Sequence, residues 1–346
     1  MFETFTYKHL HFHPPPPSPP IPPLPPSITR LFIPTPSGDL EILYSAPKNP
    51  PPSNVSPIFF VHGGMGSAWV WLPYLTYLSQ NTSIPSYAIS LRGHGNSWHP
   101  SYLRMVFFTT KHMLATDIVA GIEFVESRHE GQEIIYVGHS SGGGLGQYIL
   151  SEQLVKVKAL VLAAAVPGFG SLSVYINWWR LDPWFNLRMI FHLYHPNSPL
   201  SHPTLTRRVF FSSPSYPQSS LLEFQSHTSR YESFLWPLGM LFKFTNPHRL
   251  LSSITSASKT KVLVLAGEKD VIMTRGIMEQ LGGWYRSAGY KRIDGEEEIK
   301  ELEGADGDTE GKGARIVYVP GVGHHLQNDF GWEVGVRKLV EFVEGL

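Results

Sequence analysis

Residues 133–150 join a buried strand to a helix through a short glycine-rich turn. The apolar, β-branched run Glu133–Val137 predicts the strand, and apolar residues at helical spacing predict a helix up to residue 150. The turn between them reads Gly138-His139-Ser140-Ser141-Gly142. A serine on so tight a turn has a strained backbone that exposes its hydroxyl group, which indicates a nucleophile. The alternative is a phosphate-binding turn, but the Walker lysine and the G-x-G-x-x-G spacing are both missing.

Segments typical of strands and of helices alternate along most of the chain. An antiparallel hairpin is expected first, over residues 31–44. Continuous apolar strands between amphipathic helices then imply a mostly parallel sheet with helices on both faces, which is an α/β architecture. Strands are predicted at 58–61, 87–91, 133–137, 158–163, 261–265 and 315–319, and helices at 68–79, 110–128, 145–150, 277–287 and 333–343.

Two insertions interrupt this alternation. Residues 167–255 are rich in aromatic side chains and too long for an ordinary loop, so we expect a helical cap (lid) over the sheet. The adjacent Trp178 and Trp179 are expected to bind substrate there. Residues 290–313 are acidic and glycine-rich, and they lack the ligand spacing of an EF-hand. They are expected to form a solvated loop insertion within the core.

The first 27 residues are expected to be a disordered, proline-rich tail. Residues 14–26 are nearly all proline, which favours polyproline II and cannot build a core. An alternative role for this tail is to bind an SH3 or WW domain of a partner protein.

Composition excludes several classes of function. The formal net charge is zero and charged residues make up only 16%, so neither nucleic acid nor an anionic membrane surface is an expected partner. The absence of cysteine excludes thiolate catalysis and disulfides, and the histidines show no metal-ligand spacing. We therefore expect no metal and no cofactor. No apolar run is long enough to span a bilayer, and no signal peptide or peroxisomal C-terminus is recognised, so a cytoplasmic location is expected.

Four motifs in order make residues 28–346 resemble the α/β-hydrolase superfamily, in its lidded, esterase-like branch. His62–Gly66 follows the first parallel strand, and Leu91–Ser97 matches the R-G-x-G-x-S segment. Gly267–Asp270 matches the G-x-x-D turn that carries an acid, and Gly323–His324 follows the last strand. The resemblance implies an α/β-hydrolase core at 28–166 and 256–346, with the cap inserted after the sixth strand.

The same resemblance implies a catalytic triad. Ser140 corresponds to the nucleophile, Asp270 to the acid and His324 to the base, with Glu268 and His325 as alternatives for the acid and the base. The family forms its oxyanion hole from backbone N–H groups. These correspond here to Gly64, with Met65 as the near alternative, and to Ser141.

A serine hydrolase acting on an apolar carboxylic ester, thioester or lactone is the function that this combination favours. The aromatic cap indicates a small apolar substrate. A serine nucleophile argues against haloalkane dehalogenases and epoxide hydrolases, which carry aspartate at that position. C–C bond hydrolysis, cofactor-free haloperoxidation and lyase chemistry use the same triad, and a non-catalytic ligand receptor can use the same fold. These alternatives stay open at this point.

Overall fold

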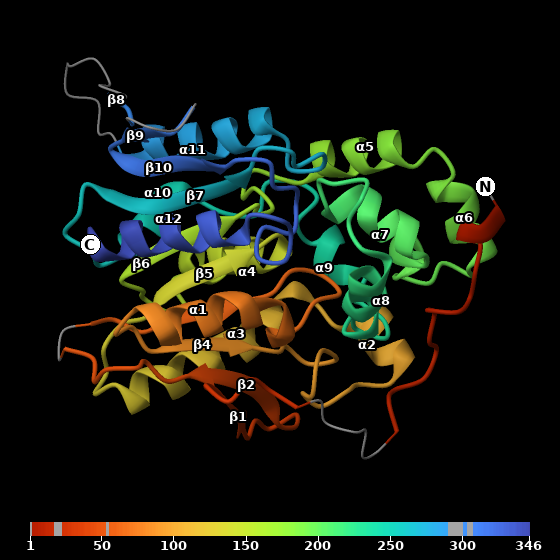
Figure 1. Cartoon of the computed structure of the whole chain (residues 1–346), viewed down its shortest axis with the longest axis horizontal. Coiled ribbons are helices and arrows are strands. Elements are labelled where there is room, and N and C mark those ends of the chain that lie inside the picture. The colour runs from red at the N-terminus through yellow and green to blue at the C-terminus, as the bar shows by residue number, and fades with distance from the viewer. Residues whose placement is uncertain (1, 17–22, 53–54, 290–299, 303–306) are drawn as a thin grey trace.

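A twisted sheet runs through the molecule and carries helices on both of its faces (Figure 1). The computed structural model describes residues 2–16, 23–52, 55–289, 300–302 and 307–346. In chain order the strands are β1 (Ile28–Ile33), β2 (Leu40–Ser45), β3 (Ile58–Val61), β4 (Ser86–Ile89), β5 (Ile135–His139), β6 (Ala159–Ala163), β7 (Thr260–Gly267), β8 (Lys300–Glu301), β9 (Thr309–Gly311) and β10 (Gly313–Val319).

The described strands form one ten-stranded sheet in the order β1-β2-β4-β3-β5-β6-β7-β10-β9-β8. Strands β4, β3, β5, β6, β7 and β10 are parallel, whereas β1, β2, β9 and β8 pair in an antiparallel way at the two edges. Because the central strands are parallel, their carboxyl ends lie side by side along one edge of the sheet, which runs across the strands. That edge is where His139 lies opposite Ala163.

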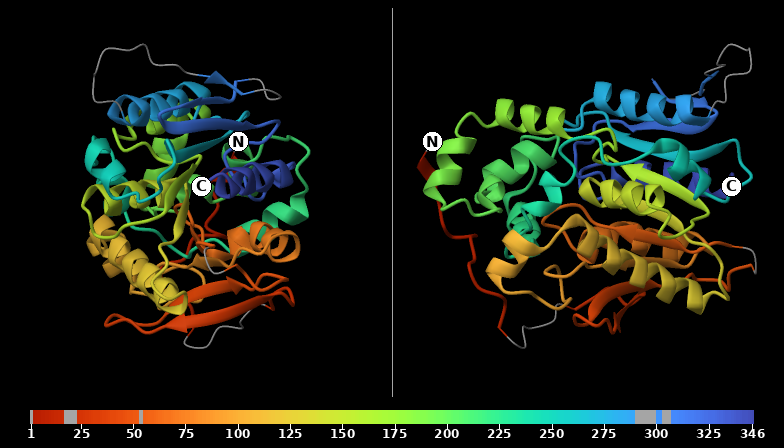
Figure 2. Two further views of the ribbon diagram at one scale, coloured as in Figure 1. Left: turned by 90° about the vertical axis from the view of Figure 1, so that its left-hand side faces the viewer. Right: turned by 180° about the vertical axis from the view of Figure 1, so that it is seen from behind.

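Two layers of helices cover the sheet (Figure 2). Helices α1 and α12 pack together on one face, and α3, α4, α10 and α11 cover the other. No helix in the described ranges is long and apolar enough to cross a bilayer. The helices and 3-10 turns are η1 (Phe2–Thr4), η2 (Ala68–Trp71), α1 (Leu72–Asn81), α2 (Tyr102–Phe108), α3 (Lys111–Arg128), α4 (Ser141–Ser151), α5 (Leu172–Leu181), α6 (Phe185–Phe191), η3 (Ser198–Leu200), α7 (Pro203–Phe210), α8 (Gln218–Ser226), α9 (Leu235–Leu238), α10 (Pro247–Ser252), α11 (Arg275–Gly289) and α12 (Trp332–Glu344).

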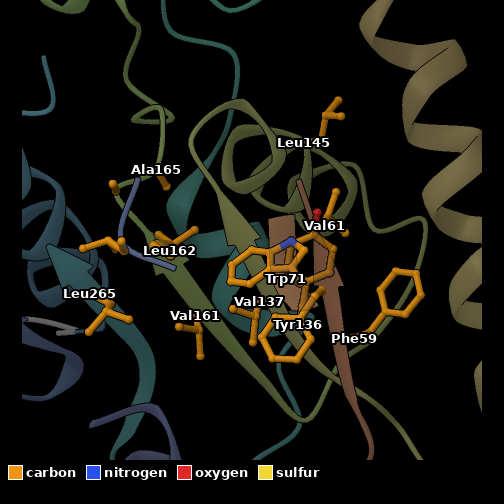
Figure 3. Close-up of a cluster of buried hydrophobic side chains, with 14 of the residues drawn as sticks. Phe59, Val61, Trp71, Tyr136, Val137, Leu145, Val161, Leu162, Ala165 and Leu265 are labelled. Atoms are coloured by element: carbon orange, nitrogen blue, oxygen red, sulfur yellow. The ribbon is translucent and has the colours of Figure 1, made fainter. Parts of the chain in front are cut away.

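The core explains why the central strands are mostly apolar. Every residue of β3, β5 and β6 is buried, because each strand has helices above and below it. Figure 3 shows Val61, Val137 and Leu162 from these strands beside Trp71 and Leu145 from the covering helices. This packing fixes the strands that carry the candidate site.

Helices α5–α9 lie beyond the carboxyl ends of the strands, as a cap inserted between β6 and β7 (Figure 1). The cap begins and ends at adjoining points, since the Phe244 N–H donates to the Gly168 carbonyl at 3.1 Å. Helix α10, by contrast, packs against α4 and α11 of the core. The inserted part is therefore closer to 168–244 than to the expected 167–255.

The N-terminal segment differs from the expected disordered tail over residues 2–16. Leu10 is only 7% exposed, and the Phe5 ring contacts the Phe191 ring at 5.5 Å. The Phe12 ring lies 4.9 Å from the ring of His195, so the segment runs along the cap (Figure 1). Aromatic residues that precede the prolines supply apolar area for this packing. Residues 17–22, within the proposed SH3 or WW ligand, lie outside the described residues.

The acidic insertion also differs from the expected loop where it is described. Its end forms strand β9, which extends the sheet beside β10. Asp308 is buried, accepts the Tyr318 N–H at 2.7 Å and pairs with Lys338 of α12. A charged side chain with two such partners is part of the fold rather than of a solvated loop. Residues 290–299 and 303–306 of this prediction lie outside the described residues.

Candidate active site

Ser140 lies on the turn between β5 and α4 with a φ angle of +50°, a conformation that residues other than glycine rarely adopt. Glycines on both sides allow the turn. A Cβ atom on Gly138 would lie 2.6 Å from the backbone of Gly143, and one on Gly142 would lie 2.2 Å from the His62 carbonyl oxygen. Strand β5 therefore lies too close to α4 for a side chain at Gly138, and α4 lies too close to the residue after β3 for a side chain at Gly142. This packing holds the serine hydroxyl at the sheet edge.

The three residues predicted as a triad come together in one hydrogen-bonded chain. The Ser140 Oγ lies 3.1 Å from Nε2 of His324, and Nδ1 of His324 lies 2.8 Å from Oδ2 of Asp270. Because a carboxylate only accepts, Nδ1 carries the proton and Nε2 is free to accept the serine proton. This tautomer is the one that a general base needs.

Asp270 is fixed by its second oxygen. The N–H groups of Ile272 and Met273 both donate to Oδ1, at 2.9 and 2.8 Å, so only Oδ2 faces His324. The alternative acid, Glu268, has a half-exposed side chain that accepts the Gly321 N–H instead. The structure thus brings Asp270, and not Glu268, to the imidazole.

The alternative base, His325, points elsewhere. It is buried among aromatic rings, including that of Phe224 at 4.7 Å, and burial is the main cause that lowers its pKa well below the ordinary value. His139 supports the base from behind, because its Nε2–H donates to the His324 carbonyl at 3.0 Å. Burial and the nearby His324 lower the pKa of His139 to about 3, which keeps it neutral.

The loop after β3 places its backbone N–H groups next to the nucleophile turn. The Gly64 N–H donates to the Ser141 Oγ at 2.8 Å. The Met65 N–H donates instead to Oε2 of Glu232, a cap residue, at 2.8 Å. Gly64 and Ser141 therefore adjoin each other, whereas the amide of Met65 already has a carboxylate partner.

Glu232 also bonds to a buried histidine of the R-G-x-G-x-S segment. Nε2 of His94 lies 2.9 Å from Oε2 of Glu232, and Nδ1 lies 2.8 Å from the Arg92 carbonyl. Because a carbonyl and a carboxylate both accept, this pairing fits a His94 imidazolium with a proton on each ring nitrogen. Burial opposes this charge, but the Glu232 carboxylate raises the pKa of His94. The sequence gives no sign of this contact, which joins residues 138 positions apart.

A cavity of about 350 Å³ opens onto Ser140 and His324. Its walls are almost entirely apolar. Trp178 lines it as expected, but Trp179 does not and is 53% exposed, because successive helical side chains point about 100° apart. The apolar walls come mainly from the cap: Val174, Tyr175, Trp178, Phe185, Met189, Pro196, Pro199, Phe210, Phe234, Trp236, Pro237, Leu238, Met240 and Leu241.

Two other features bear on what this chain binds. A cavity of about 900 Å³ lies near Lys48 and Lys158, at the amino ends of the strands and away from Ser140. Among the residues that the structure describes, no three His, Asp or Glu side chains gather as metal ligands.

Comparisons with known proteins identify the fold and the family of this chain. Solved structures with the same fold include a thermophilic esterase from Thermogutta terrifontis (15% identity, TM-score 0.57, covering 91% of this chain and 99% of that one). A second is the esterase EaEST from Exiguobacterium antarcticum (16% identity, TM-score 0.57, covering 90% of this chain and 98% of that one). A third is carboxylesterase CesB from Bacillus subtilis (18% identity, TM-score 0.53, covering 91% of this chain and 91% of that one). No individual curated sequence matches significantly. The family model described as alpha/beta hydrolase family matches residues 58–333, and the chain belongs to that family.

Proposed function

We propose that this protein is a serine hydrolase that cleaves apolar carboxylic esters through a Ser140-His324-Asp270 triad. The observation that carries the proposal is the continuous hydrogen-bonded chain from Asp270 through His324 to the Ser140 hydroxyl, at the floor of an apolar cavity. Nucleophile, base and orienting acid are the three groups that acyl transfer needs, and the order of these three side chains along the hydrogen-bonded chain supports those roles.

The reaction follows from these contacts. His324 removes the proton of Ser140 as Oγ attacks the carbonyl carbon, and Asp270 stabilises the imidazolium that results. The N–H groups of Gly64 and Ser141 hold the oxyanion. The Gly64 N–H then donates to the oxyanion in place of the Ser141 hydroxyl oxygen, its partner in the free protein. His324 then protonates the leaving group, and water hydrolyses the acyl-enzyme by the same steps.

The walls of the cavity support an apolar substrate. Aromatic and aliphatic side chains from the cap surround the space above Ser140, and the described lining includes few polar groups. Burial of each additional methylene stabilises binding by about 0.8 kcal/mol, or roughly fourfold in kcat/KM. We therefore expect esters with longer acyl or alcohol chains to be preferred over acetate esters until the cavity is filled.

Labelling with a fluorophosphonate and peptide mapping test this proposal directly. The wild type should be labelled at Ser140, and Ser140→Ala should abolish labelling and lower kcat on p-nitrophenyl esters by about 10⁴-fold or more with an unchanged melting temperature. Persistent labelling at Ser141 would contradict the assignment.

A substrate panel defines the bond that is cleaved. Carboxylic esters, acyl thioesters, lactones and a vinylogous diketone, assayed on one preparation, separate ester chemistry from thioester, lactone and C–C bond hydrolysis. Higher kcat/KM on the diketone than on every ester would replace the ester proposal by C–C bond hydrolysis. Tight binding without turnover of any member would favour a ligand receptor.

A further inference from the structure

A short cap segment holds the loop that follows β3. Met65 in this loop has a φ of +63°, which is strained for a residue with a side chain. Its N–H donates to Oε2 of Glu232 and its carbonyl accepts the Ser229 N–H, each at 2.8 Å. Both polar groups of its backbone are therefore satisfied by the cap, and a strained conformation persists where its surroundings fix it in this way.

Glu232 is buried and almost fully used by these contacts. Oε2 accepts from Met65 and from His94, and Oε1 accepts the Ser233 N–H at 2.8 Å. A His94 imidazolium balances the charge of the Glu232 carboxylate. The paired carboxylate then requires no positively charged group of a substrate, and it repels a nearby oxyanion less than a lone charge would. Glu232 lines the cavity beside Ser140, but its hydrogen bonds all go to protein groups, so these contacts favour a role toward the protein rather than toward the substrate.

We propose that Glu232 is a positioning residue that couples the cap to the oxyanion hole. By fixing the peptide between Gly64 and Met65, Glu232 anchors one side of the Gly64 Cα and so restricts the rotation of the next peptide, whose Gly64 N–H points toward Ser141. His94 in turn fixes Glu232. The inference rests on the proposed serine-hydrolase function for its catalytic effect, but the contact between cap and loop stands independently of it.

The loss of this contact should act on the transition state. A backbone donor contributes only where it meets the developing oxyanion, so a small shift of Gly64 lowers kcat while ground-state binding is kept. Removal of one whole donor costs about 10²–10³ in kcat, so misdirection of Gly64 in Glu232→Gln should lower kcat by about 10- to 100-fold with little change in KM. The affinity of a boronic acid, whose adduct carries the same tetrahedral oxygen, should fall by a similar factor.

The experiment compares Glu232→Gln and His94→Gln with Glu223→Gln, an exposed carboxylate on α8 of the same cap. Kinetics on one p-nitrophenyl ester and boronic acid affinity report the catalytic effect. Amide hydrogen exchange of the peptide spanning residues 62–68 reports the loop and needs no activity. Exchange there should rise at least about tenfold in the first two variants and stay unchanged in Glu223→Gln.

Two results overturn the proposal. If Glu232→Gln matches Glu223→Gln in loop exchange and in kcat, Glu232 does not position the loop. If KM rises while kcat and boronic acid affinity are kept, Glu232 binds substrate instead. The proposed function can also fail by itself. If the wild type does not react with fluorophosphonate, but amide hydrogen exchange of residues 62–68 still rises in Glu232→Gln, the serine-hydrolase function is refuted and the contact between cap and loop is established.

Discussion

Asp270→Asn changes one oxygen of the site to an amide nitrogen, and the structure dictates which one. Oδ1 accepts two backbone N–H groups, from Ile272 and Met273, so the amide oxygen must take that place. The amide NH₂ then faces Nδ1 of His324, which must accept rather than donate. The proton of the imidazole moves to Nε2, where it blocks removal of the Ser140 proton.

The size of the effect follows from the same contacts. The flipped amide would leave two buried N–H donors without acceptors, at about 1–3 kcal/mol each. The wrong orientation of the imidazole proton is therefore favoured by at least about 2 kcal/mol, or about 30-fold in population. Adding the lost stabilisation of the imidazolium, we expect kcat to fall by about 10⁴-fold.

The assay is steady-state hydrolysis of a p-nitrophenyl ester, with the melting temperature as a check of folding. Glu268→Gln is the matched control, because it removes a nearby carboxylate that does not contact His324. We expect it to keep kcat within a factor of about two. The reasoning fails if Asp270→Asn retains a tenth or more of the wild-type kcat, or if the two variants exchange their effects.

Two further predictions use features of the cap. On a panel of p-nitrophenyl esters ranging from acetate to laurate, Trp178→Ala should change the chain-length preference, because it removes part of the cavity wall, and Trp179→Ala should leave it unchanged. Identical chain-length profiles of the two variants would show that neither side chain limits the substrate. The second concerns pH. Glu232 raises the pKa of His94 in the folded protein, so their pairing stabilises the fold fully below the ordinary histidine pKa and less as the pH rises through the raised value. Urea unfolding of wild type and Glu232→Gln should therefore show a larger stability difference at about pH 6 than at about pH 9, and a larger difference at the higher pH would reverse the assigned charge state.

Elements set by local sequence patterns were predicted well. The apolar run 58–61 coincides with β3, and the helix expected at 110–128 forms as α3, with the Thr110 hydroxyl capping its first turn. The α/β-hydrolase fold is confirmed, and Ser140, Asp270 and His324 converge because each follows a parallel strand at one edge of the sheet. In these regions local periodicity and strand order determine position.

Contacts between distant segments without periodic patterns could not be predicted. Glu232 lies between short helices, 167 positions from Met65, and nothing in its neighbours indicates a partner. Phe5 and Phe12 were assigned to the proline-rich tail, although their rings pack on the cap. Trp178 and Trp179 are chemically identical, and only the orientation of α5 decides which one faces the cavity. Tertiary packing alone determines these positions.

The hydrogen bond that closes the base of the cap makes it an exchangeable unit. Gly168 and Phe244 meet where the cap leaves and rejoins the core, so a foreign segment has to bring its two ends to this junction and to keep a carboxylate in the place of Glu232 for Met65 and His94. Each doubling of its length would add only about 0.6 kcal/mol of closure entropy. Gly168 must stay in any chimera, since a Cβ atom there would lie 2.1 Å from the Thr245 hydroxyl. A graft between these two residues would replace most of the apolar wall of the cavity while the strands beneath it stay as they are.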